Sequence, residues 1–325
     1  MRHDPHSTGT SSTRAQRTPG RATPRPRGRP VTVGVDGSRE SLDAAQWAAR
    51  EALRRGLPLR LLHAGEDPAP RSGPGGGADR STALLDRAAI TLSYAHPALE
   101  IVARRTLRPV APALLSAAAE SAELVLGSRV FTTSGGFLVG PVGAAVVARA
   151  ECPVVLVRAG EHPADEHLLG SDREPSVRTP YRPVVLGLDP DHAGDELLEH
   201  AFDAAAIRRT SLQVLHTWSL PAHAGHAHAP TGHASAARDD APTLENARAQ
   251  ALSAVLRPWC NKFPDVLVVE HLVYGWPRHQ LVKAATRASL LVLGRRRGAV
   301  GRQLGRTTHS VLHHVTCPVA VVPYG

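Results

Sequence analysis

The strongest constraint on the fold of this chain is that its sequence repeats. An apolar strand pattern that ends on Asp36 returns in the second half, where it ends on Asp189, 153 positions later. The strand patterns that follow end on His63 and His216, which are the same distance apart. Two independent landmarks with one offset indicate a duplicated unit. At 325 residues, the chain is long enough for two domains that each bury a core.

Within each copy, near-continuous apolar strands alternate with helical patterns of roughly 15 residues, which is typical of a parallel sheet covered on both faces. The predicted fold class is α/β, with two tandem, open, mostly parallel five-stranded sheets of the Rossmann-like type. Helices are predicted over 39–55, 79–95, 109–121 and 141–150 in the first copy, and over 192–209, 242–260, 277–288 and 305–315 in the second.

The chain divides into four segments. Residues 1–29 hold seven Arg against the single Asp4 and account for most of the net charge of +9. They lack apolar periodicity and aromatic residues for base stacking, so they are predicted to form a disordered, solvated basic tail rather than a nucleic-acid grip. The predicted domains are 30–158 and 181–325, and the Pro-, Gly- and charge-rich stretch 159–180 is the predicted linker.

The cysteines and the hydropathy pattern indicate a compartment. Cys152, Cys260 and Cys317 share no CxxC spacing and cannot all pair with one another, which favours a reducing environment. No apolar run approaches the roughly 18 residues that span a bilayer, and the N-terminus lacks a secretory apolar segment. A cytoplasmic location without a membrane partner is therefore expected.

Candidate chemistry gathers at one edge of the first predicted sheet. Asp36 ends the first strand, and Gly127 ends the fourth, so both reach the carboxyl edge where open α/β sheets bind ligands. A loop follows Gly127 and runs to Gly140, just before a predicted helix. Glycines there let backbone N–H groups approach a phosphate, although such a loop is also consistent with a simple tight turn.

These residues resemble a known family. The run Val-Gly-Val-Asp36-Gly-Ser, the run Leu-Val-Leu-Gly127-Ser-Arg with Gly140 thirteen residues later, and the run Cys152-Pro-Val-Val-Leu-Val resemble a universal stress protein domain, and the ordered set occurs twice. The resemblance implies a fold like that of the adenine-nucleotide alpha hydrolases and a role in stress survival. It also implies that the two domains pair through their last strands as an intramolecular pseudo-dimer.

The resemblance further implies where an adenine nucleotide would bind. ATP-binding members resemble one another in a loop of the form G-x2-G-x9-G-[S/T]; here Val130 replaces the middle glycine, and Pro141 replaces the hydroxyl residue. Valine disfavours positive φ, and proline removes an N–H, so the predicted ATP site is weak. The predicted cofactor-binding residues are Gly34, Val35, Asp36, Gly127, Ser128, Arg129, Gly140, Pro141 and Val142.

The second copy departs further from that loop. Arg297 stands where the middle glycine belongs, Gly305 comes two residues early, and Pro190 follows Asp189. Arginines crowd the shortened loop and form either a clamp for a polyanion or, the favoured interpretation, a solvated charged loop. They are Arg295, Arg296, Arg297, Arg302 and Arg306.

Other polar residues receive structural interpretations. His63 and His216 end buried strands, where a hydrogen-bonded histidine is favoured over a catalytic one. Cys152 and Cys317 are interpreted as small buried hydrophobes. His226 and His228, in the His-rich stretch 221–242, have a spacing that can chelate a metal, but no carboxylate or cysteine is fixed beside them.

The predicted function is that of a stress-response binding and signalling protein with a degenerate adenine-nucleotide site in domain 1. Its expected partners are the nucleotide, the other domain, a second copy of the chain as a homodimer, and an unidentified signalling protein. The alternative is an enzyme that hydrolyses a nucleotide or transfers a nucleotidyl group in the same crevice. Asp36 is the only candidate carboxylate there, and no metal-binding partner for it can be chosen from the sequence, so binding without catalysis is the expectation.

Overall fold

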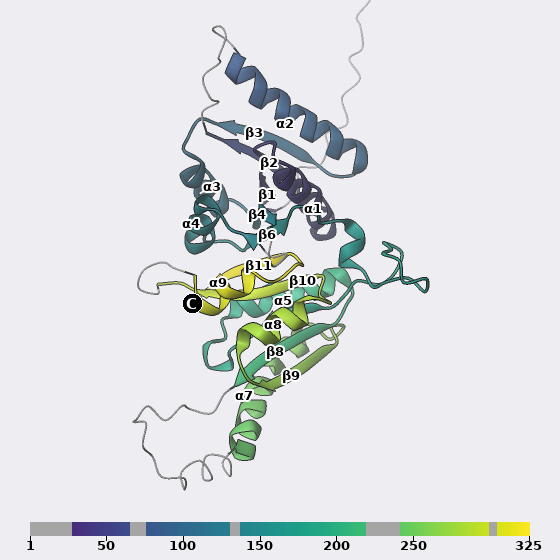
Figure 1. The fold of residues 1–325 in the computed structure, drawn as a ribbon, viewed down its shortest axis with the longest axis vertical. Helices are drawn as coiled ribbons and strands as arrows, with labels where there is room; N and C mark the ends of the chain where they lie inside the picture. The colour runs from purple at the N-terminus through teal and green to yellow at the C-terminus, as the bar shows by residue number, and fades with distance from the viewer. Residues whose placement is uncertain (1–27, 66–75, 131–136, 219–240, 299–303) are drawn as a thin grey trace, which may run out of the picture.

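The described structure is a computed structural model that covers residues 28–65, 76–130, 137–218, 241–298 and 304–325 (Figure 1). Most of the predicted basic tail and most of the His-rich stretch 221–242 lie outside the described residues.

The first copy begins with a strand that leads into a capped helix. After β1 (Val31–Gly34), the Ser38 hydroxyl accepts a hydrogen bond from the Ser41 N–H and starts α1 (Arg39–Arg55), and Gly56 ends the helix at φ 63°. The copy continues with β2 (Leu59–Ala64), α2 (Gly76–Ala95), β3 (Ile101–Thr106), α3 (Val110–Ala119), β4 (Glu123–Val130), β5 (Phe137–Leu138), α4 (Pro141–Arg149) and β6 (Val154–Arg158).

The second copy repeats this order. It consists of β7 (Val184–Gly187), the short 3-10 helix η2 (Pro190–His192), α5 (Asp195–Arg208), β8 (Leu212–Trp218), α7 (Ala241–Lys262), β9 (Val268–Tyr274), α8 (Pro277–Ala285), β10 (Leu290–Arg296), α9 (Arg306–Leu312) and β11 (Val319–Tyr324).

The eight helices predicted from the sequence are present, and most of their ends lie within two residues of the prediction. Four ends differ by three residues: α2 starts at Gly76 rather than at 79, α8 ends at Ala285 rather than at 288, and the start of α5 and the end of α9 also differ. Helix α5 starts at Asp195 rather than at 192, because Pro190 begins the separate turn η2, where the Asp189 carboxylate accepts a hydrogen bond from the Asp191 N–H. Helix α9 ends at Leu312 rather than at 315. Strand β5 was not predicted, because a two-residue strand has no period to detect.

The sheet confirms the α/β prediction and joins the two copies. Its strand order is β3-β2-β1-β4-β6-β11-β10-β7-β8-β9, with β5 attached to β4. Within each copy these ten strands run parallel, but β6 and β11 are antiparallel, with Val319 opposite Leu156. The two five-stranded sheets are therefore one continuous sheet, and the last strands of the copies meet at its centre, as the resemblance implied (Figure 1).

Two apolar cores lie on opposite faces of this sheet, and each runs through both copies. One core holds residues of α1, α2, α5 and α7, and the other holds residues of α3, α4, α8 and α9. Alternate strand residues feed the two cores: Val155 and Val157 of β6 face the first, whereas Val154 and Leu156 face the second. The copies are thus joined by shared packing on both faces.

A buried cluster of charges crosses the joint between α1 and α5. Arg208 of the second copy lies 2.7 Å from Glu51 of the first, and both side chains are fully buried. Arg55 and Arg54 approach the same carboxylate at 2.8 and 3.0 Å. Although burial opposes ionisation of Glu51, these arginines hold its pKa well below the ordinary value.

The segment between the copies is docked on α1. The Gly160 N–H donates to the Asp43 carboxylate at 2.8 Å. The 3-10 helix η1 (Pro163–Glu166) then places Glu166, which is almost fully buried, 2.7 Å from Arg50 and 3.0 Å from Arg54. These contacts tie the segment to the first copy rather than leaving it a free spacer.

Candidate functional site

A pocket of about 520 Å³ opens at the carboxyl ends of β1 and β4 in the first copy. These strands are neighbours, and β1 lies where the strand order turns from β2 to β4, so the pocket sits at the switch point of the sheet. All nine residues predicted to bind a cofactor line it, although they come from three separate stretches of the chain. They are Gly34, Val35, Asp36, Gly127, Ser128, Arg129, Gly140, Pro141 and Val142. The structure brings them together, and their binding of a ligand stays a prediction.

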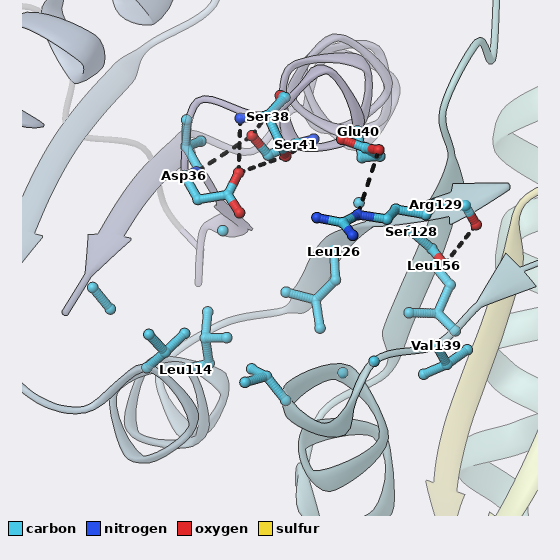
Figure 2. Close-up of a pocket in the computed structure, with 18 of the residues that line it drawn as sticks. Asp36, Ser38, Glu40, Ser41, Leu114, Leu126, Ser128, Arg129, Val139 and Leu156 are labelled. Carbon is cyan, nitrogen blue, oxygen red and sulfur yellow. Dashed lines mark hydrogen bonds and ion pairs between the residues drawn. The ribbon is translucent and has the colours of Figure 1, made fainter. Parts of the chain in front are cut away.

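Asp36 is fixed at one side of the pocket by the start of α1. The Ser38 N–H and hydroxyl donate to the Asp36 Oδ1 at 2.9 and 2.6 Å, as Figure 2 shows. Partial burial tends to raise the pKa of Asp36, but these bonds and the nearby Ser41 hydroxyl hold it below the ordinary value. Asp36 therefore presents an ionised, oriented carboxylate.

One arginine lies at the same edge. The Arg129 guanidinium, on β4, is 3.9 Å from the Glu40 carboxylate, and its side chain is 76% exposed (Figure 2). A pair of this length in water is weak. Arg129 therefore remains available to a bound anion.

The opposite wall is made by the start of α4, residues 139–143, and is named here the α4 wall. Gly140 is the N-cap, and a Cβ placed on it would meet no atom within 4 Å. Pro141 occupies the first helical position, which suits its fixed φ but removes an N–H from the wall. The wall is open to a ligand and offers fewer donors than a loop with serine at 141.

The middle-glycine position of the family loop is part of a strand here. Strand β4 continues past Gly127 to Val130, which pairs antiparallel with Phe137 of β5. An extended valine in a ladder needs no positive φ, so the chain replaces the expected turn with a short β-ribbon.

Gly127 lines the pocket, and its lack of a side chain is also required for packing. A Cβ built on Gly127 would lie 2.3 Å from the Glu40 carbonyl oxygen and 2.7 Å from the Ser41 nitrogen. Only glycine lets the first turn of α1 lie this close to β4. Because that turn holds Asp36, Gly127 shapes the pocket indirectly.

Several pocket residues escaped the sequence argument. Ser38, Glu40 and Ser41 come from the first turn of α1, and Val110 and Leu114 come from α3. The sequence Asp36-Gly37-Ser38 before a helical pattern is a recognisable cap and could have indicated the serines. Nothing in the local sequence marks Val110 or Leu114, because it is the crossover that places α3 beside β1.

The second copy has a smaller and more polar pocket of about 450 Å³ at the equivalent place. Asp189 lines this pocket, but its carboxylate already contacts His192: the His192 Nδ1 lies 2.9 Å from the Asp189 Oδ2. The Tyr324 ring packs on Gly294, where a Cβ would lie 2.5 Å from that ring. A side chain of the last strand therefore takes the space beside Gly294.

Two arginines of the second loop make internal contacts. Arg295 donates to the carbonyl of Ala150 in the first copy, and Arg297 lies 2.7 Å from Glu196. Arg302 lies outside the described residues. The contacts of Arg295 and Arg297 do not fit a polyanion clamp that needs both guanidinium groups free.

The histidine and cysteine predictions agree with the structure. His63 and His216 donate through Nδ1 to the carbonyls of Val35 and Leu188 at 2.8 and 3.0 Å, so the hydrogen-bonded interpretation is confirmed. Cys152 and Cys317 are buried and free, and burial raises the pKa of each thiol to about 12. Both are poor nucleophiles at neutral pH.

The first pocket has the size and lining of a small-molecule site. Its volume lies in the range of small-molecule sites, roughly 300 to 1,000 Å³. Apolar side chains from α3 and β4, an oriented carboxylate, an exposed arginine and open space at Gly140 face it.

Fold and pockets together define a tandem protein of the doubly wound α/β class, with a pocket in each copy at the strand-order switch. The model of the family described as "Universal stress protein family" matches residues 28–158 and 180–323. The chain belongs to the universal stress protein family.

Relatives and solved structures agree with this assignment. A universal stress protein of Mycobacterium tuberculosis is 29% identical over 317 residues, which cover 90% of this chain and 94% of the relative. The structure of a universal stress protein from Archaeoglobus fulgidus covers 92% of this chain and 99% of its own, with 16% identity and a TM-score of 0.59. At this identity the likeness shows the fold alone.

A family protein from Arabidopsis thaliana, solved with AMP bound, matches 40% of this chain and 91% of its own at 19% identity and a TM-score of 0.30. That likeness is too low to carry an argument about this chain's ligand. In the part of the chain that the structure describes, no helix is both long and apolar enough to cross a membrane.

Proposed function

We propose that this chain is a stress-response binding protein whose first copy holds an adenine nucleotide in the pocket between β1 and β4. The observation that carries the proposal is the convergence of nine residues, chosen from the sequence, on one pocket at the switch point of the sheet.

The pocket offers a place for each part of such a ligand. Val110, Leu114 and Leu126 supply apolar surface for a flat base. The Asp36 carboxylate accepts hydrogen bonds from the amino or hydroxyl groups of the ligand. Arg129 and the open space at Gly140 receive the phosphate.

The charges of the pocket favour a short phosphate chain. Asp36 and Glu40 carry negative charge, and among the described residues that line this pocket Arg129 is the only basic one. Each further phosphate adds negative charge, and the described lining residues offer no second basic side chain to balance it. We therefore expect AMP to bind at least as tightly as ATP.

We further propose that the site binds without catalysing a reaction. Asp36 has a lowered pKa and is held by Ser38, so it is a weak base. Incubation with ATP should release no phosphate beyond the rate without protein. Hydrolysis that Asp36→Asn abolishes would instead favour the enzymatic alternative.

Calorimetric titration of AMP and ATP tests the binding proposal. Wild type should bind both weakly, and Asp36→Ala should bind neither measurably. Pro141→Ser should bind ATP more tightly, because the restored backbone N–H contributes about 0.5 to 1.5 kcal/mol. Val130→Gly should add no affinity, because Val130 is paired with Phe137 in the β-ribbon.

Asp189→Ala, the matching change in the second copy, is the control and should leave binding unchanged. The absence of binding by every variant would contradict the proposal and favour a nucleotide-independent protein. Binding that only Asp189→Ala removes would place the site in the second copy.

A further inference from the structure

The segment 137–150, which contains the α4 wall of the first pocket and the rest of α4, is contacted at both ends by side chains of the second copy. Just before the wall, the carbonyl of Phe137 accepts a hydrogen bond from Nδ1 of His313 at 3.1 Å. Just after α4, the carbonyl of Ala150 accepts one from the Arg295 guanidinium. Since a carbonyl only accepts, the Nδ1 of His313 carries the proton in this contact.

The same segment is packed into the core that the two copies share. The Phe137 side chain is fully buried in that core, and Val139 of the wall packs against it. Leu312 and Val315, which flank His313, belong to the same core. The His309 ring lies edge-on to His313 with centroids 4.8 Å apart and limits the rotation of that ring.

Within the first copy, α4 packs on α3 through Val146 and Val147, but the segment before it is held by a short β-ribbon. Strand β5 pairs with β4 at two positions, Arg129 with Leu138 and Val130 with Phe137. At the wall itself, a Cβ placed on the N-cap Gly140 would meet no atom within 4 Å. The position of the start of α4 therefore depends in part on the contacts that fix Phe137 before it and Ala150 after the helix.

We propose that the second copy positions the α4 wall of the first pocket through His313 and Arg295. We also propose that a ligand bound in the pocket in turn stabilises α9. His313 and Arg295 are positioning residues, because neither lines the pocket. The part of this inference that concerns affinity rests on the proposed nucleotide site.

The coupling must act in both directions. If the contacts of α9 place the wall for a ligand, a ligand that orders the wall stabilises those contacts by the same free energy. The stability of α9 in the second copy would then depend on whether a ligand is bound to the first copy.

Hydrogen–deuterium exchange on the full chain tests the positioning without any ligand. His313→Ala should speed exchange of amides in 137–150 by about fivefold, the effect of losing one hydrogen bond, and should leave 31–64 unchanged. His313→Asn should restore protection, since its side-chain amide can donate from nearly the same place. Arg295→Ala should act similarly on the end of α4. The neighbours supply controls, His314→Ala and Arg296→Ala, for which no bond to the first copy is seen among the described contacts.

Titration with adenosine and AMP tests the link to the ligand. His313→Ala should weaken the affinity for AMP by about fivefold and leave the affinity for adenosine nearly unchanged, because adenosine has no phosphate to contact the α4 wall. In wild type, AMP should slow exchange in 306–315.

Unchanged exchange in 137–150 for both variants would overturn the inference, and so would a uniform increase across both copies, which indicates general loosening. Equal loss of adenosine and AMP affinity would also overturn it. If wild type binds neither ligand, the proposed nucleotide site fails, while the exchange data still decide whether the second copy positions the wall.

Discussion

At the scale of single residues, two glycines that look alike in sequence have different tasks. Gly127 lies under the first turn of α1, where a Cβ would meet backbone atoms at 2.3 to 2.7 Å. Gly140 borders open space and has an ordinary extended backbone. The first is needed by the fold, and the second leaves room for a ligand.

This difference predicts that the same substitution changes the free energy of unfolding by different amounts at the two positions. Gly127→Ala should lower the free energy of unfolding by about 1 to 3 kcal/mol, because backbone on both sides of the clash has to move. Gly140→Ala meets no atom and should lower stability by at most about 1 kcal/mol, the effect of alanine at an N-cap. Urea denaturation of both variants measures the difference, and equal stability of the two would refute the packing role of Gly127.

At the scale of elements, α1 connects the pocket with the joint between the copies. Its first turn holds Asp36 through Ser38, and its last turns present Glu51 to Arg208 of α5. Arg208 is 2% exposed, so removing its carboxylate partner would leave a guanidinium in the core without compensation.

Glu51→Ala should therefore destabilise the protein by about 3 to 5 kcal/mol, the effect of breaking a buried ion pair. The matched control is Arg39→Ala on the same helix, which removes a pair whose arginine is 75% exposed and should change stability by about 0 to 1 kcal/mol. Thermal and urea unfolding measure both. A Glu51→Ala protein as stable as the Arg39→Ala protein would show that the cluster contributes little.

At the scale of the whole molecule, the joint also contains glutamates that burial keeps protonated. Burial raises the pKa of Glu123, at the start of β4, to about 7, although Arg55 opposes the rise. Burial, with Asp165 and Glu166 nearby, raises the pKa of Glu161 to about 8. Each group binds its proton more tightly in the folded state than in the unfolded chain, where its pKa is near 4.5.

Stability should consequently fall as pH rises from 6.5 to 8. A raised carboxyl pKa stabilises fully below its unfolded value, and the contribution is lost as pH climbs through the folded value. His200 opposes this fall near pH 6.5, because burial and Arg55 lower its folded pKa to about 3, whereas the unfolded chain still binds part of a proton around its ordinary value of 6.5. That opposing contribution disappears as pH approaches 8. Urea midpoints across this range test the slope, and Glu123→Gln should flatten its lower part. A midpoint that stays constant or rises would contradict these two pKa shifts.

Much of the architecture followed from the sequence, because its causes are local and repeated. The apolar strand and helix patterns and the single offset between Asp36 and Asp189 predicted two α/β copies and most helix ends to within about a residue. The nine pocket residues also came together as predicted, since parallel strands bring their carboxyl ends to one edge.

Tertiary structure alone decided the rest, because it depends on which distant surfaces meet. No local pattern pairs Glu51 with Arg208, 157 positions apart, or His313 with Phe137, 176 apart. Nor does the sequence show that Gly127 faces the backbone of α1, or that Tyr324 fills the space beside Gly294. The sequence determined the two units and the edge where a ligand would bind. Antiparallel pairing of β6 with β11 decided how they share one sheet and two cores, since residues of both copies pack in each core only once those strands meet.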